Sequence, residues 1–228
     1  MSEEKKLTEQ ESLQLISAMI QKVKNNYHDT GIGSLLWGSV VFIASFVSCL
    51  RSRYDFNIGF DIWLIVLFAI IPQVYLSIKE NKKSKAKRYD DDAIDTVWLV
   101  FGLTIFGLSF YQSTVGDTTV KIINEEGWMM MKHYLSGNQP DEQIKPFTLS
   151  VYSLYMLIYA FPTLVTGLVK KFNPMIIGAI ITYILFMVSC FTASQYDYLF
   201  GAFAALFCWF IPGVILRRKH LAERKHHV

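Results

Sequence analysis

Six stretches of the chain are almost free of charged side chains, and each is about as long as a membrane-spanning helix. They cover residues 32–50, 60–78, 96–115, 147–169, 174–193 and 198–216. A helix needs roughly 20 residues to cross a hydrocarbon core about 30 Å thick. Asp61 is the only formally charged residue within them, and it lies near an end. The pattern predicts an all-α integral membrane protein with six transmembrane helices in residues 32–216.

Composition supports this class. Of the 228 residues, 52% are hydrophobic and only 18% are charged, which leaves too few charged side chains to cover a soluble globule of this size.

The Lys and Arg residues in the connections predict the orientation. If the N-terminal segment before the first span faces the cytoplasm, 17 of the 22 Lys and Arg residues lie on the cytoplasmic side. This bias predicts cytoplasmic termini, an outer loop over 116–146, a cytoplasmic loop over 79–95 and a cytoplasmic tail over 217–228 in a bacterial inner membrane. Anionic lipid headgroups account for the net charge of +3, so no nucleic-acid partner is expected. The candidate surface for lipid or a protein partner in the 79–95 loop is Lys79, Lys82, Lys83, Lys85, Lys87 and Arg88.

Residues 1–31 predict a cytoplasmic amphipathic helix before the first span. Apolar residues recur every three or four positions from Leu13 through Ile16 and Ile20 to Val23 and Tyr27. Such a helix lies on the inner headgroup surface, or it docks a cytoplasmic protein or a second copy of the chain.

Prolines and glycines suggest an internal repeat of three like-oriented helical hairpins. The three spans that run inward carry Pro72, Pro162 and Pro212, and the three that run outward carry Gly38, Gly102 and Gly178. A proline frees a backbone carbonyl in the preceding turn, so these positions are packing features or parts of a gate.

The outer loop contains Trp128, three consecutive methionines, Tyr134 and Leu135, which suit a short helix on the outer surface. The three cysteines have no metal-ligand spacing, so we expect them to be small packing residues: Cys49, Cys190 and Cys208.

Asp91, Asp92 and Asp95 form a D-D-x-x-D that is similar to the Mg²⁺-diphosphate motif of membrane prenyltransferases of the UbiA type. That family has more spans and a second aspartate-rich motif, whereas the matching loop here reads KKFNP. The alternative is that the aspartates favour the start of a helix through its dipole. No cofactor, metal or catalytic motif is otherwise found, so an enzyme is not expected.

A transporter, channel or permease needs polar groups inside the bundle. The candidates for lining or gating are Gln73, Tyr75, Thr163 and Thr166, with Pro72, Pro162 and Pro212 beside them. No ionisable side chain lies in mid-membrane to couple transport to protons or sodium. The architecture is similar to permease subunits of the second ABC type, but that family places its outer helices between the fifth and sixth spans.

The segments ESLQLISAMIQKVK, GSLLWG and IPGVILRR resemble a group of small six-span bacterial inner-membrane proteins. The resemblance implies the architecture and no activity. The function expected from the sequence is non-enzymatic sensing, regulation or assembly through the cytoplasmic face, with a solute permease as the alternative.

Overall fold

The structure is a computed structural model that describes residues 30–83, 89–145 and 152–226, together with Gln10 and Leu13. The regular elements in this part are helices and two short strands. In chain order they are α2 (Ile32–Tyr54), α3 (Leu64–Lys83), α4 (Tyr89–Glu125), β1 (Met131–Lys132), β2 (Glu142–Gln143), α5 (Ser153–Val169), α6 (Asn173–Ser189), α7 (Ser194–Ala205), the π-helical segment η1 (Leu206–Phe210) and α8 (Ile211–His226). The prediction of an all-helical chain is confirmed.

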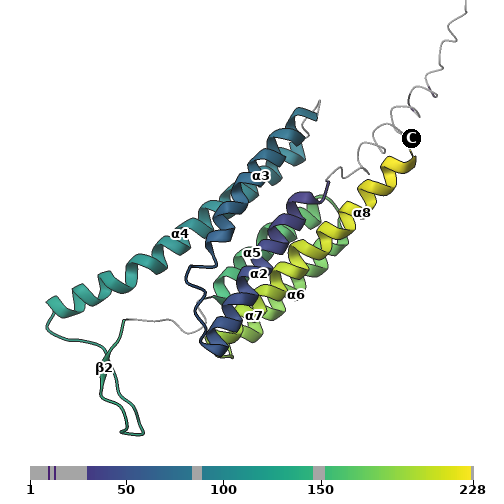
Figure 1. The fold of residues 1–228 in the computed structure, drawn as a ribbon. Helices are drawn as coiled ribbons and strands as arrows, with labels where there is room; N and C mark the ends of the chain where they lie inside the picture. Colours follow the sequence, from purple (N-terminus) through teal and green to yellow (C-terminus); the bar gives the residue numbers. More distant parts are fainter. Residues whose placement is uncertain (1–9, 11–12, 14–29, 84–88, 146–151, 227–228) are drawn as a thin grey trace, which may run out of the picture.

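Four helical rods form a packed block: α2, α5, α6 and the unbroken rod α7–η1–α8 (Figure 1). At the level of the backbone, α3 contacts α2 and α4 contacts α5, with no further contact recorded for either among the described elements. Both helices therefore stand away from the block, as Figure 1 shows. Successive rods run in opposite directions, with α7, η1 and α8 counted as one rod, so the chain passes from end to end of the molecule repeatedly.

Three helices in the described part are long and apolar enough to cross a membrane: Ile32–Tyr54, Asp92–Glu125 and Gln195–Glu223. The other apolar helices are shorter: Leu64–Lys79, Ser153–Val169 and Asn173–Ser189. The 17 residues of α5 extend over about 26 Å, a little less than a hydrocarbon core of about 30 Å.

The rod α7–η1–α8 contains one wide turn. The N–H of Ile211 donates to the carbonyl of Leu206, five residues earlier, where an α-helix would use the carbonyl four residues earlier. The next residue, Pro212, has no N–H to give to the preceding turn. The proline thus permits a π turn over 206–210 without breaking the rod.

Two glycines bring neighbouring helices against this π turn. A Cβ at Gly38 of α2 would lie 2.5 Å from the amide nitrogen of Phe210, and a Cβ at Gly178 of α6 would overlap the carbonyl oxygen of Phe207. Close backbone approach through small residues is the usual way for membrane helices to pack without a hydrophobic driving force. At Gly102 of α4, by contrast, a Cβ would meet nothing within 4 Å. The three glycines of the predicted repeat therefore lie in different surroundings.

One stripe of α4 faces the block. Ile94 is buried, and Trp98, Phe101 and Ile105 follow at helical spacing and are half-buried, whereas Leu99 and Leu103 between them are exposed. The other faces of α4 are apolar and uncovered by protein, which suits a helix surrounded by lipid.

The predicted outer loop forms a hairpin. Met131 and Lys132 pair with Gln143 and Glu142 in antiparallel register, and α4 extends to Glu125 before it. The prediction of a short surface helix around Trp128 is therefore wrong. Gly127 and Gly137 have positive φ, which a helix through this region could not accommodate.

Several other predicted boundaries differ from the observed helices. The third predicted span, 96–115, lies inside the 37 residues of α4, and the second begins four residues before α3. The predicted amphipathic helix over 1–31 falls almost wholly outside the described residues.

Candidate functional site

The residues predicted to line the bundle lie in two different environments. Pro162, Thr163 and Thr166 of α5 and Pro212 of α8 are buried in the packed block. Pro72 and Tyr75 are exposed on α3, and Gln73 is half-buried between α3 and α2. The structure thus brings the α5 and α8 residues into one core and leaves the α3 residues apart from it.

Thr163 lies at the centre of this core, and its side chain is fully buried. Its hydroxyl donates to the carbonyl of Tyr159 at 2.9 Å and accepts the indole N–H of Trp209 at 3.0 Å. Trp209 belongs to the π turn, so this hydrogen bond ties α5 to η1. Both polar groups are satisfied inside the protein, as burial requires.

Thr166, one turn further along α5, has the corresponding relationship with α4. Its hydroxyl accepts the indole N–H of Trp98 at 3.2 Å. The ring of Trp98 lies 6.3 Å from that of Trp209, and Phe101 packs edge-on against Trp209 at 6.0 Å. Aromatic pairs at these distances contribute about 0.5–1.5 kcal/mol each beyond burial. Trp98 therefore holds α4 on the block.

A third hydroxyl secures the other side of the π turn. Thr182 of α6 donates to the carbonyl of Gly178 at 2.9 Å, and its oxygen lies 3.1 Å from the sulfur of Cys208. Because the only proton of the Thr182 hydroxyl is used on Gly178, the Cys208 thiol is the donor in this contact. Cys208 is fully buried and packs as a small core residue.

The hydroxyls of these three threonines are all used in hydrogen bonds between helices. Thr163, Thr166 and Thr182 each accept a hydrogen bond from Trp209, Trp98 or Cys208. Neutral hydroxyls in membrane helices commonly serve as such interhelical contacts. The sequence analysis identified Thr163 and Thr166 but not their donors, because Trp209 and Trp98 are distant from them in the chain. The signal that could have found them is that a buried indole needs an acceptor.

A groove opens on one flank of the block, between α4, α5 and α6. Its volume is about 320 Å³. The lining residues are Val100, Phe101, Thr104, Leu157, Ile158, Phe161 and Tyr183. Thr104 uses its hydroxyl on the carbonyl of Val100 at 2.8 Å, so the groove is predominantly apolar. Such a lining suits a hydrocarbon chain better than a polar solute.

Gln73 packs against the start of α2. A Cβ at Gly33 would lie 3.3 Å from its Oε1, and this oxygen is buried without a hydrogen-bond partner among the described residues. The Nε2 of Gln112 in α4 is likewise buried without a hydrogen-bond partner among the described residues. The two amides belong to helices that make no backbone contact with each other, so they do not form one polar site.

The predicted aspartate motif lies at the beginning of α4. The helix starts at Tyr89, so Asp91 and Asp92 are in its first turn, where carboxylates oppose the positive end of the helix dipole. Asp92 and Asp95 are exposed, and the side chain of Asp91 lies outside the described part. Within the described part, no group of three or more His, Cys, Asp or Glu side chains is arranged to hold a metal ion.

The predicted basic surface is partly described. Lys79, Lys82 and Lys83 form the last turn of α3, and the ammonium of Lys79 lies 5.8 Å from the ring centre of Tyr75. Lys85, Lys87 and Arg88 lie outside the described residues.

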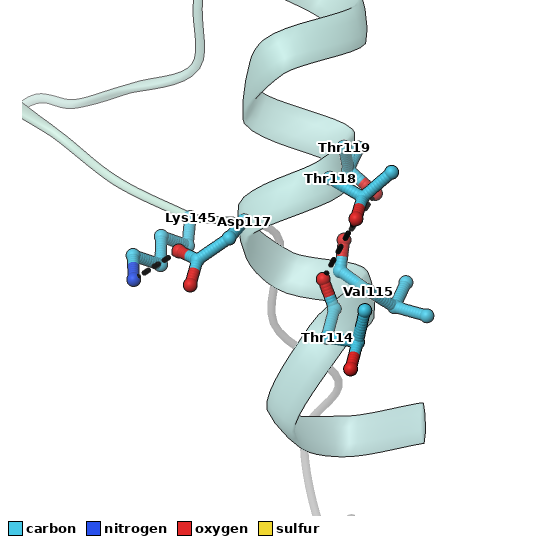
Figure 2. A network of polar contacts seen from close by, with 6 residues as sticks. All are labelled: Thr114, Val115, Asp117, Thr118, Thr119 and Lys145. Carbon is cyan, nitrogen blue, oxygen red and sulfur yellow. Dashed lines mark hydrogen bonds and ion pairs between the residues drawn. The ribbon is translucent and has the colours of Figure 1, made fainter. Parts of the chain in front are cut away.

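At the opposite end of α4, polar groups are satisfied locally. Figure 2 shows Thr118 and Thr119 bonded to the carbonyls of Thr114 and Val115, while Asp117 pairs with Lys145 from the loop. Hydroxyls that bond back to their own helix need no partner protein. This end of α4 therefore offers no unsatisfied hydroxyl for recognition.

In the hairpin beyond α4, Lys132 donates to the Tyr134 hydroxyl at 2.7 Å, and this contact holds the pKa of Lys132 above its usual value. His133 lies 2.7 Å from a carboxylate oxygen of Asp141. All four side chains are exposed or at the surface, and they form pairs rather than a site.

No family model, curated protein or solved structure matches the chain.

Proposed function

We propose that the chain is a six-span protein of a bacterial inner membrane, with both termini in the cytoplasm. We further propose that it acts without catalysis, in sensing, regulation or assembly, through its cytoplasmic end.

The arrangement of the shorter helices supports six crossings. Helices α5 and α6 run antiparallel to each other and lie beside the long rods (Figure 1). Helix α3 returns along α2 in the same way. A membrane that contains α2 and the α7–α8 rod would contain these helices as well, and each is within a few residues of the length that spans a bilayer.

The observation that carries the functional proposal is the use of the central hydroxyls. The hydroxyls of Thr163 and Thr166 are the polar groups best placed for a path through the bundle. They already accept hydrogen bonds from the indoles of Trp209 and Trp98. A path for a polar solute needs donors and acceptors that can exchange between protein and solute. A core whose hydroxyls serve helix packing suits a protein that transmits or scaffolds rather than conducts.

The surface proposed for a cytoplasmic partner combines α3 and α8. The end of α3 carries Lys79, Lys82 and Lys83, and α8 continues to His226 at the same end of the molecule (Figure 1). A partner of complementary, acidic surface fits this end. The occupant is a cytoplasmic protein or a second copy of the chain.

Site-specific photocrosslinking in cells tests this proposal. A photoreactive residue at Lys79 or Lys225 should give one reproducible crosslinked protein, and deletion of Met1 to Asn26 should abolish it without preventing membrane insertion. The matched control is a photoreactive residue at Lys132 in the outer hairpin, which should not crosslink to a cytoplasmic protein. Absence of any crosslinked protein from both cytoplasmic positions would remove the basis of the proposed role.

A permease remains the second candidate because of the groove between α4, α5 and α6. Its apolar lining favours a hydrophobic substrate. Reconstituted vesicles distinguish the two roles: transport of a hydrophobic tracer that is lost in Phe161→Trp, which fills the groove, would favour the permease and count against the first proposal.

A further inference from the structure

One end of the packed block carries a cluster of basic side chains from two segments that are distant in the sequence. Lys170 and Lys171 lie in the turn between α5 and α6, and Arg217, Arg218 and Lys219 lie on α8. We refer to these five residues as the basic cluster. None of them was part of the basic surface predicted from the sequence, which lies between α3 and α4.

An apolar contact brings the two segments together. Phe172, Met175 and Leu216 form a small buried core in which the turn packs directly against α8. The ammonium of Lys219 lies 5.3 Å from the centre of the Phe172 ring, within the range of a cation–π contact. Lys171, which precedes Phe172, is therefore held close to the basic residues of α8.

The cluster is open on its outer side. Lys171, Arg218 and Lys219 are exposed. Lys171 has a φ of 51°, a left-handed conformation that ends α5 sharply and turns the chain into α6. The fold thus fixes the backbone that carries these charges while their side chains remain accessible.

The described helices that surround the cluster contain few acidic residues. The sequence contains no Asp or Glu between Gln143 and Tyr196, and none between Tyr198 and Ala222. On α8 the acidic residue nearest to the cluster is Glu223, one helical turn beyond Lys219. Helix α2, whose start packs on α8, carries no acidic residue over Ile32–Tyr54. Among the described residues of α2, α5, α6 and α8, the five basic residues of the cluster therefore outnumber the acidic residues at this end.

The depth of the cluster matches a lipid headgroup. From Ser194 to Arg217 the rod rises by about 35 Å, compared with a hydrocarbon core about 30 Å thick. Leu168 and Val169, just before the two lysines, are exposed apolar residues that suit the acyl region. The change from apolar to basic surface thus falls at the same level on α5 and on α8.

We propose that the basic cluster binds the phosphate headgroup of an anionic membrane lipid, with Lys171, Arg218 and Lys219 as the accessible donors. Basic pockets between membrane helices on the cytoplasmic side are a recurrent form of anionic-lipid site. The inference rests on the proposed membrane crossing of the α7–α8 rod and is independent of the proposed protein partner.

Native mass spectrometry of the purified full chain tests the site, with phosphatidylglycerol titrated against phosphatidylcholine of the same acyl chains. The triple variant Lys171→Gln, Arg218→Gln, Lys219→Gln should lose about fivefold in phosphatidylglycerol affinity per residue replaced, or roughly a hundredfold in all. Affinity for phosphatidylcholine should not change. The charge-preserving variant Lys171→Arg, Arg218→Lys, Lys219→Arg should keep the preference, which separates a loss of charge from a loss of fold.

The matched control removes three exposed lysines at the other end of the molecule: Lys121→Gln, Lys132→Gln and Lys145→Gln. It should bind phosphatidylglycerol as the parent does. Equal loss in this control, equal binding of the two lipids by the parent, or an unchanged affinity in the cluster variant would each overturn the proposal. Displacement of the lipid by soluble glycerol phosphate would also overturn it, since the site would then recognise a free phosphate. Because the assay contains no other protein, its failure is distinguishable from a failure of the crosslinking experiment.

Discussion

The indole N–H of Trp209 lies 3.0 Å from the hydroxyl of Thr163, and this contact joins the π turn of the longest rod to α5. Both side chains are almost completely inaccessible, at 3% and 0% exposure, so neither group can turn to solvent if its partner is removed. The pair is therefore a sensitive point for testing the packing of the core.

Thr163→Val should destabilise the protein by about 1–3 kcal/mol, because the shape is kept while the Trp209 N–H is left buried without an acceptor. Thr163→Ser keeps the hydroxyl and should cost less. The measurement is thermal or denaturant unfolding in one detergent, followed by circular dichroism. Equal stability of the two variants would show that the hydrogen bond does not contribute.

Gly178→Ala should destabilise the protein by about 1–3 kcal/mol or more, because the new methyl group overlaps the carbonyl of Phe207 and α6 must move away from the rod. Gly102→Ala is the matched control. Its Cβ meets nothing within 4 Å, so alanine should be neutral or stabilise α4 by up to about 1 kcal/mol through its higher helix propensity. Similar effects at the two glycines would contradict the observed packing.

The native cysteines should differ in reactivity without any substitution. Cys190 is exposed at the end of α6, whereas Cys208 is fully buried in the π turn. Maleimide labelling in membranes, with sites mapped by peptide mass spectrometry, should modify Cys190 and should modify Cys208 only after denaturation. A reagent that cannot cross the membrane should reach Cys190 from the outer side in the proposed topology. Labelling of Cys190 from the cytoplasmic side alone would contradict that topology.

Thr166→Val should loosen α4 from the block, because Trp98 loses its acceptor while the aromatic contacts remain. Hydrogen exchange of reconstituted protein should then increase in peptides from the α4 segment around Trp98, with little change in α2. The control is Thr104→Val on an exposed face of α4, where the hydroxyl bonds only to its own helix. An equal increase in both variants would show that Thr166 does not hold α4.

The helical segments could be predicted from the sequence because each depends on local composition. The hairpin after α4 could not be predicted, since Met131 and Lys132 pair with residues ten or more positions away and no local alternation marks them. Only part of the π turn could be predicted from the sequence. Pro212 predicted a disturbance in the helix, but the width of the turn also depends on Gly38 and Gly178, which approach it from other helices.

The hydrogen-bond partners at the centre of the block could not be predicted from the sequence either. Thr163 and Thr166 were identified as polar residues inside the bundle, yet their role depends on which donors reach them. Trp98 and Trp209 are supplied by α4 and η1, and only the packing of three helices brings them to α5. Residue spacing within one segment contains no information about such partners.

The contrast between Gly178 and Gly102 has a mechanical consequence. At Gly178 the backbone of α6 lies directly against the backbone of the π turn, with no room for even a methyl group between them. Helix α4 is attached by side chains, chiefly through Trp98 and through Ser109, whose hydroxyl lies 3.2 Å from that of Tyr155. Side-chain contacts can break and re-form at far smaller cost than overlapping backbones. We therefore expect α4 to move against the packed block more easily than α6 can, because its attachment depends mainly on side chains.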